Sequence, residues 1–274
     1  MEIGLIATII AGISVIAWLL IHTLFVQTTV VDMNHARLPA LTIVHISDLH
    51  GRTRFLNGSL HRLINDWQPD LVCVTGDLAQ HPEQLEGVMK EIARIRAKDG
   101  IFFVPGNYER EELRGFRKRK YPKDTYNRMK QVWQQSMIVL ENSGASLSYH
   151  TGKLEVYGFD NSEYGNERYT GEHDGKGKEK AFTLFLAHSP NIISSIKRHE
   201  LTADLLLTGH THGGQIRILG KTAGAYKHFH IGAKADQQVG IFAISRGLGT
   251  TKIPVRMHCF PEVTIYRINK DEKR

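Results

Sequence analysis

The first 26 residues of the chain are almost entirely apolar. No residue from Ile3 to Val26 carries a formal charge. A helix over these residues, at about 1.5 Å per residue, would be about 36 Å long, which is enough to cross a hydrocarbon core of about 30 Å. Trp18 and His22 lie toward its far end, where amphipathic rings favour a membrane interface. The pattern predicts one membrane-spanning helix.

A buried core helix and a cleaved signal peptide are the alternatives for this segment. A core helix would carry polar residues on one face, and a signal peptide would begin with Lys or Arg and end at a small-residue cleavage site. The chain begins instead with Met1-Glu2 and has no Ala-x-Ala site after the apolar run. We therefore expect an uncleaved anchor and short linker over residues 1–37, and one further domain over residues 38–274. Arg37, although Asp32 balances its charge, favours a cytoplasmic domain by the positive-inside rule.

Beyond residue 40, short apolar runs alternate with stretches of helical spacing. The helical pattern covers residues 57–67, 83–97 and a basic stretch at 110–130, and a polar loop is expected over 163–180. Apolar runs rich in β-branched residues predict strands over 41–46, 70–75, 101–104, 146–149, 154–159, 182–187, 204–208, 240–245 and 262–268. The alternation predicts an α/β fold.

Five of these strands each run into a short turn that carries Asp, His or Asn. Ligands of α/β sheets gather just outside the carboxyl ends of the strands, because the loops there converge on a crevice. We therefore expect one cluster at a sheet edge, made of Asp48, His50, Asp77, Asn107, His188, His210 and His212.

The residue types of this cluster indicate metal binding. Carboxylate and amide oxygens together with imidazoles suit Mn²⁺, Fe²⁺ or Zn²⁺ better than Mg²⁺ or Ca²⁺ alone. Seven side chains are too many for one tetrahedral site, and are about right for two divalent ions that share a carboxylate. Each motif alone would usually be an ordinary turn, but their joint occurrence in order, each at a strand end, favours the metal site.

Composition and charge exclude several classes of protein. With 41% hydrophobic and 23% charged residues, the chain is an ordinary globular sequence and not a disordered one. Its two cysteines, Cys73 and Cys259, form neither a disulfide framework nor a zinc ribbon. The formal net charge of +7 favours an anionic partner. No recognition motif or stacking array indicates specific binding of nucleic acid.

The basic stretch over residues 110–130 follows directly after Glu109 and so begins close to the expected metal cluster. A solvated helical face would explain it without any function. Alternatively, it is a cap or a membrane-facing patch that attracts anionic head groups. The candidates for contact with substrate are Arg110, Arg114, Arg117, Lys118 and Arg119.

The order of these motifs resembles the calcineurin-like metallophosphoesterase family. The resemblance rests on Asp48-Leu49-His50, Gly76-Asp77, Gly106-Asn107-Tyr108-Glu109, His188 and Gly209-His210-Thr211-His212, and the segment over 245–262 resembles the membrane-anchored bacterial branch. It implies a four-layer α-β-β-α sandwich that holds two divalent metal ions.

The resemblance also implies a role for each residue. Asp48, His50 and His212 would hold the first metal, Asn107, His188 and His210 would hold the second, and Asp77 would bridge the two. Two such ions can clamp a phosphate ester and activate a bridging water as a hydroxide nucleophile. Asp77, Asn107 and Tyr108 are therefore the expected catalytic positions, and Glu109 is expected to orient a ligand rather than to bind metal.

Tyr108 departs from the family pattern, which usually has His at this position. The family's His lies beside the phosphate and is thought to assist the leaving group. A phenol with an ordinary pKa near 10 can donate a proton but cannot carry positive charge. We expect substrates with a good leaving group to suffer least from this replacement. A slower site, or a second histidine such as His81 in the same role, are the alternatives.

Together these features predict a membrane-anchored phosphoesterase that cleaves a phosphodiester or pyrophosphate bond. The anchor and the basic stretch favour a lipid-linked substrate. A phosphodiesterase for soluble nucleotides and a metal-binding scaffold without turnover are the alternatives.

Overall fold

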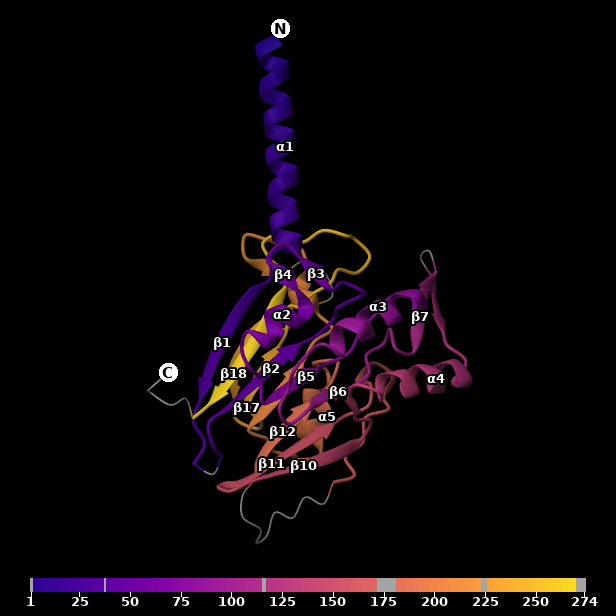
Figure 1. Ribbon diagram of the computed structural model, residues 1–274, viewed down its shortest axis with the longest axis vertical. Coiled ribbons are helices and arrows are strands. Elements are labelled where there is room, and N and C mark those ends of the chain that lie inside the picture. The colour runs from indigo at the N-terminus through magenta and orange to yellow at the C-terminus, as the bar shows by residue number, and fades with distance from the viewer. Residues whose placement is uncertain (1, 37, 115–116, 172–180, 223–225, 270–274) are drawn as a thin grey trace.

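The computed structural model describes residues 2–36, 38–114, 117–171, 181–222 and 226–269. Helix α1 (Glu2–Leu24) projects from the rest of the molecule, as Figure 1 shows. Its segment Ile3–Leu24 contains an 18-residue window with a mean hydropathy of 2.5, and it is long and apolar enough to cross a membrane. The single apolar helix that the sequence predicts is thus confirmed as a candidate membrane span.

The first sheet contains six strands in the order β1-β18-β2-β5-β6-β9. β18 runs parallel to β1 and antiparallel to β2, while β2, β5, β6 and β9 are parallel to one another. The amino end of β1 and the carboxyl ends of β2, β5 and β6 therefore lie at the same end of the sheet. The strands are β1 (Gln27–Met33), β18 (Glu262–Ile268), β2 (Leu41–Ile46), β5 (Leu71–Val74), β6 (Ile101–Phe103) and β9 (Ile138–Val139).

The second sheet also contains six strands, in the order β10-β11-β12-β13-β17-β16. β11, β12, β13 and β17 are parallel, and the two edge strands run antiparallel to their neighbours. The strands are β10 (Ser143–Tyr149), β11 (Gly152–Gly158), β12 (Phe182–Leu186), β13 (Leu205–Thr208), β17 (Gly240–Ile244) and β16 (Gly232–Asp236).

The central strands are apolar on both faces because each face is covered. Successive side chains of a strand point to opposite faces, so Ile43 and Leu205 pack between the two sheets, while Val44 packs under helices and Leu206 on the outside of the second sheet. Helices α2 (Leu60–Asn65), α3 (Pro82–Ile92) and α4 (Lys123–Trp133) contribute to the outer core of the first sheet, and α5 (Ile192–Arg198) to that of the second. The expected four-layer α-β-β-α sandwich is confirmed.

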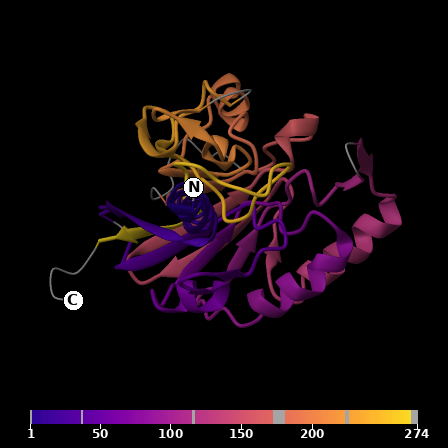
Figure 2. The same cartoon turned by 90° about the horizontal axis from the view of Figure 1, so that it is seen from above.

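Short elements join these layers. They are the hairpins β3 (Arg54–Phe55) with β4 (Gly58–Ser59), β7 (Glu111–Arg114) with β8 (Arg117–Lys120) and β14 (Arg217–Ile218) with β15 (Lys221–Thr222), and the 3₁₀ turns η1 (Ser162–Tyr164) and η2 (His212–Gly214). Figure 2, viewed along α1, shows the orange and yellow loops of the C-terminal half on one side of the helix and the indigo-to-magenta half on the other.

Two local predictions were wrong. The basic stretch is not one helix, because β7 and β8 pair as antiparallel strands, in which Glu111 faces Lys120 and Glu112 faces Arg119. These opposite-charge pairs stabilise a hairpin. Pro122 is the N-cap of α4. A proline disfavours the helical conformation of the residue before it, so α4 does not extend back into the hairpin.

Residues 27–33, which the prediction assigned to the linker, form the edge strand β1. Only Phe25 and Val26 separate it from α1. Helix α1 is therefore joined to the sheet by two residues only.

Candidate metal centre

The seven predicted ligands come together at the carboxyl ends of five strands. Asp48 and His50 follow β2, Asp77 follows β5, and Asn107 follows β6. The second sheet supplies His188 after β12, and His210 and His212 after β13. Parallel strands from both sheets thus direct these side chains into one buried region between the sheet edges.

Asp48, His50 and His212 form a first group, whose ligand atoms all lie within 4.8 Å of one another. The Nε2 atoms of His50 and His212 are 3.0 Å apart, and His212 Nε2 is 3.5 Å from Asp48 Oδ1. All three side chains are buried.

Asp77, His188 and His210 form a second group with the same 4.8 Å limit. His188 Nε2 lies 3.0 Å from His210 Nδ1 and 3.1 Å from the Oδ1 atom of Asn107. Asp77 Oδ2 is 3.4 Å from His188 Nε2 and 3.7 Å from His50 Nε2, so it lies between the two groups. This is the position expected of a shared carboxylate.

The donor set fits two divalent ions. Ligands about 2.1 Å from an octahedral ion lie about 3 Å from one another, close to the distances found in both groups. Burial lowers the pKa of His50 and that of His210 to about 4, so both imidazoles are neutral and offer a lone pair. The Nδ1 atom of His188 faces the Thr75 carbonyl oxygen at 2.7 Å, which leaves Nε2 directed into the cluster.

The backbone of the cluster is strained. Positive φ angles, which residues other than glycine rarely adopt, occur at Asp48 (52°), His50 (47°), Asp77 (58°), His210 (68°) and His212 (52°). Such strain concentrates at functional sites, where the surrounding structure maintains it.

Glycine next to two of these residues allows the close packing. A Cβ atom at Gly76 would lie 2.5 Å from His188 Nδ1, and one at Gly209 would lie 1.8 Å from Ser47 Oγ. Neither position can hold a larger residue unless its neighbours move.

Glu109 holds the turn that carries Asp77. Its carboxylate accepts hydrogen bonds from the backbone N–H groups of Gly106 at 2.6 Å, and of Asp77 and Leu78 at 2.8 Å each. The Glu109 carboxylate thus contacts backbone N–H groups and belongs to neither ligand group. An orienting role would use these contacts.

Tyr108 lies against the first ligand group. Its backbone N–H donates to Asp77 Oδ1 at 2.9 Å, its ring meets that of His50 edge-on with centroids 4.8 Å apart, and its hydroxyl is 3.1 Å from Thr251 Oγ1. Burial raises the pKa of the phenol, so it keeps its proton at neutral pH. His81, the alternative, is the N-cap of α3, and its backbone N–H bonds to Gln84.

The basic candidates take different positions. Arg110 is paired with Glu141 at 3.1 Å and with Asp160 at 2.5 Å. Lys118 bonds to Glu111, and its Nζ atom lies 5.8 Å from the centre of the Tyr108 ring. Arg117 and Arg119 are exposed on β8. The side chain of Arg114 lies outside the part of the chain that the structure describes.

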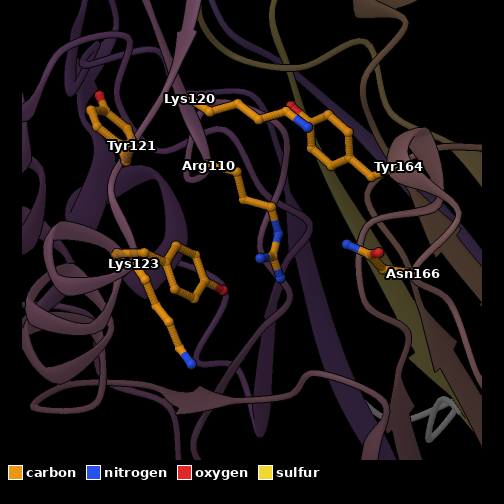
Figure 3. Close-up of a pocket in the computed structure, with 7 residues that line it drawn as sticks. Arg110, Lys120, Tyr121, Lys123, Tyr164 and Asn166 are labelled. Carbon is orange, nitrogen blue, oxygen red and sulfur yellow. The ribbon is translucent and has the colours of Figure 1, made fainter.

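A pocket of about 380 Å³ opens beside this hairpin. In Figure 3, Arg110 points between Lys123 and Asn166, while Lys120 extends over the ring of Tyr164. The lining residues are Arg110, Lys120, Tyr121, Lys123, Tyr126, Tyr164 and Asn166. Cations and phenol rings together suit an anionic group carried on a larger organic body.

Sequence reasoning missed several residues that surround the ligands. The Tyr226 hydroxyl is 3.0 Å from His210 Nε2, Glu163 Oε1 is 3.6 Å from the same atom, and buried Arg256 lies behind His212, with its Nη2 atom 3.4 Å from Nδ1. All three come from segments outside the strand-end motifs, so no local signal could have identified them.

Comparison with known proteins supports the assignment made from the motifs. Residues 41–214 match the calcineurin-like phosphoesterase family. YkoQ of Bacillus subtilis (strain 168), named an uncharacterized metallophosphoesterase, is 28% identical over 263 residues, which cover 89% of this chain and 90% of YkoQ. The protein YpbG of the same bacterium is 30% identical, with 83% of this chain and 80% of YpbG covered. A Bos taurus protein named transmembrane protein with metallophosphoesterase domain is 26% identical over 85% of this chain and 53% of its own length. Because the family match covers well over half of its length, this chain belongs to the calcineurin-like phosphoesterase family.

Proposed function

We propose that this metal-dependent phosphoesterase uses two divalent ions to hydrolyse a phosphodiester or pyrophosphate bond of a lipid-linked substrate at a membrane. The observation that carries the two-metal proposal is the pair of ligand groups that meet at Asp77, whose Oδ2 atom is within 3.7 Å of both His50 and His188. The sheet that bears four of the ligands continues directly into α1, which supports a membrane substrate.

The proposed ligands keep the roles that the family resemblance implies. Asp48, His50 and His212 would hold one ion, Asn107, His188 and His210 the other, and Asp77 both. Ions bound there would supply positive charge to the phosphate oxygens and activate a water as the nucleophile. Mn²⁺, Fe²⁺ or Zn²⁺ fit a set of imidazoles and carboxylates.

Two side chains of the protein would assist the departure of the leaving group. Tyr108 holds a proton on its hydroxyl, which burial keeps in place and Thr251 orients. Lys118, fixed by Glu111 at 2.5 Å, offers a positive charge next to that ring. Burial lowers the pKa of Lys118, but the hydrogen bond and charge of Glu111 outweigh this effect and raise it, so the ammonium stays charged. A phenol is a weaker acid than an imidazolium, which favours a pyrophosphate or an activated ester as substrate.

A phosphodiesterase for soluble nucleotides is the second candidate. The pocket in Figure 3 supports it, because tyrosine rings beside Lys120 and Lys123 could take up a base and a phosphate. The complete ligand set argues against a scaffold without turnover. The cytoplasmic location of the domain, inferred from Arg37, and the lack of specific nucleic-acid binding stay predictions.

Hydrolysis of bis-p-nitrophenyl phosphate by the full chain, with Mn²⁺ added, tests the proposed chemistry. We expect metal-dependent turnover that the Asp77→Ala variant loses and that the Glu86→Ala variant retains, because Glu86 lies on the exposed face of α3. Absence of turnover with Mn²⁺, Fe²⁺, Zn²⁺ and Co²⁺, on this ester and on lipid pyrophosphates alike, would contradict the proposal and favour the scaffold.

The lipid preference needs a separate comparison. With the full chain in nanodiscs, we expect a higher kcat/KM for a membrane-embedded lipid pyrophosphate than for a water-soluble analogue with the same reacting group. A higher value for nucleotide diesters would favour the second candidate.

A further inference from the structure

We propose that three loops around the base of α1 form a lipid-contacting surface, the loop collar, which rests in the headgroup region of an anionic bilayer. The loop collar consists of residues 52–57, 217–222 and 251–258. This inference rests on the proposed membrane role of α1, and it adds that the domain itself touches the bilayer with the end that carries the ligand cluster.

The topology of the first sheet brings that end to the anchor. α1 ends at Leu24 and β1 begins at Gln27. Because β1 is parallel to β18 and β18 is antiparallel to β2, the carboxyl end of β2 lies where α1 joins the domain. In Figure 1, β3, β4 and the yellow loop before β18 accordingly lie at the foot of α1.

The loop collar is fixed to the last turn of α1 by hydrogen bonds. The backbone N–H of Leu56 donates to the Leu24 carbonyl at 2.9 Å, and that of Arg256 to Thr23 Oγ1 at 2.9 Å. The backbone N–H of His258 donates to His22 Nδ1 at 3.0 Å. These contacts hold two of the collar loops level with the end of the apolar helix.

Each of the three loops presents an apolar side chain to the outside. The exposed fraction is 58% for Leu56, 94% for Leu219 and 52% for Ile253. Exposed apolar side chains that gather beside a membrane span are typical of a surface that dips into the interface.

Leu219 gives the clearest sign that these side chains have a partner. Leu219 and Gly220 join β14 to β15, and both have positive φ angles, 49° and 75°. A two-residue turn of this kind favours Asn or Asp before the glycine, because most other residues are strained at a positive φ. The chain has an almost fully exposed leucine at this position. Neither the geometry of the turn nor packing explains this residue, whereas contact with acyl chains would explain it.

The charges of the loop collar complement an anionic bilayer. Its three segments contain no Asp or Glu and carry six Lys or Arg residues, Arg52, Arg54, Arg217, Lys221, Lys252 and Arg256. Of these, Arg54, Lys221 and Lys252 are exposed and each lies within two residues of one of the exposed apolar side chains. Basic groups at the level of the phosphates, with apolar groups just below, suit a membrane of anionic phospholipids.

Hydrogen bonds connect the loop collar to the ligand cluster. Gln215, three residues after His212, accepts from the backbone N–H of Thr251 at 2.9 Å and donates to the Ile253 carbonyl at 2.6 Å. Thr251 Oγ1 in turn meets the Tyr108 hydroxyl. The loop that would contact the bilayer is thus bonded to the residue beside the first ligand group.

Fluorescence quenching in nanodiscs tests the loop collar in the full chain. Single cysteines in place of Leu219 and Ile253 carry an NBD label, and the nanodiscs contain anionic phospholipid with headgroup-proximal doxyl-labelled lipid. His150, in the β10–β11 turn at the opposite end of the second sheet, supplies the exposed control position, and Ile10 in α1 supplies the membrane-inserted one. Unsubstituted protein corrects for labelling of the buried Cys73 and Cys259.

We expect the signal at positions 219 and 253 to fall at least about twofold, as at position 10, and the signal at position 150 to stay unchanged. Quenching at position 10 alone would overturn the loop collar and leave the anchor intact. Quenching at 219 and 253 without position 10 would support the loop collar and contradict the anchor. Quenching at none of the three would contradict both. Turnover of bis-p-nitrophenyl phosphate by the same labelled proteins reports separately on the proposed chemistry.

Discussion

At the scale of single residues, Tyr108 is the main departure of this chain from its family. The hydroxyl is buried, bonded to Thr251 and held beside His50, so it retains a proton at neutral pH. The residue thus preserves a donor at a position where an imidazole would also provide charge. The loss of that charge slows a reaction most when the leaving group is strongly basic and must be protonated as it departs.

The Tyr108→Phe variant tests this role. We expect kcat to fall about 100-fold for an alkyl phosphodiester and less than about 10-fold for bis-p-nitrophenyl phosphate, because nitrophenolate leaves without a proton. Steady-state kinetics of both substrates measure the difference, with Tyr149→Phe, far from the cluster, as the matched control. An equal loss on both substrates would mean that Tyr108 only positions its neighbours.

His45 makes the stability of the domain depend on pH. Burial lowers its pKa to about 3, against an ordinary value of 6.5, while its Nε2 atom pairs with Thr75 Oγ1 at 2.8 Å. The unfolded chain therefore takes up the proton first, and this contribution to stability is complete above pH 6.5 and is lost as the pH falls from 6.5 toward 3. Between pH 7.5 and 5 the loss amounts to about 2 kcal/mol.

The His45→Gln variant should lack this part of the pH dependence, because the amide keeps a polar group near Thr75 but does not titrate. Chemical unfolding of both proteins in detergent at pH 7.5 and pH 5 measures the effect. An equal loss of stability in the two proteins would show that His45 is not the responsible group.

At the scale of elements, the strand ends were predictable and the irregular connections were not. Gly76-Asp77 comes just after the apolar run that forms β5. Its place at a strand end can therefore be predicted from neighbouring residues alone. The β7–β8 hairpin was predicted as helix, because its basic residues suit the exposed face of a helix as well as a strand. What decides between them is the pairing of Glu111 and Glu112 with the opposite strand.

Two glycines test how tightly the elements meet at the centre. Gly209→Ala should lower the free energy of unfolding by about 1–3 kcal/mol and weaken metal activation, because its Cβ would lie 1.8 Å from the oxygen of buried Ser47. Gly87→Ala, in α3 with nothing within 4 Å of the added carbon, should raise it by about 0.5–1 kcal/mol. Urea unfolding and a Mn²⁺ titration of activity compare the pair. Similar behaviour of the two variants would contradict the crowding at Gly209.

At the scale of the whole molecule, the centre joins the two sheets. His188, His210 and His212 come from the second sheet, while Asp48 and Asp77 come from the first, so ions bound between them would cross-link the layers. Ligands that bind only the folded state stabilise it by mass action.

Chelation tests this coupling. We expect EDTA to lower the melting temperature of Mn²⁺-loaded protein by on the order of 10 °C, since each ion at 100 times its Kd contributes about 2.7 kcal/mol. Scanning calorimetry in detergent measures the shift, and the Asp77→Ala variant should respond much less. A melting temperature that EDTA leaves unchanged would argue against ions shared between the sheets.

The sequence by itself determined the apolar helix, the five strands that run into the candidate ligands and the side chains that follow them, because each of these depends on residues that are neighbours in the chain. The tertiary structure alone decided which loops surround the ligands. Tyr226, Glu163 and Arg256 reach the centre only because the two sheets pack face to face. It also decided the place of β1, whose polar and apolar alternation is weak and whose partner β18 lies more than 230 residues further along the chain. Pairings of that separation depend on the complete fold. They place α1 at the end of the domain that carries the candidate metal centre.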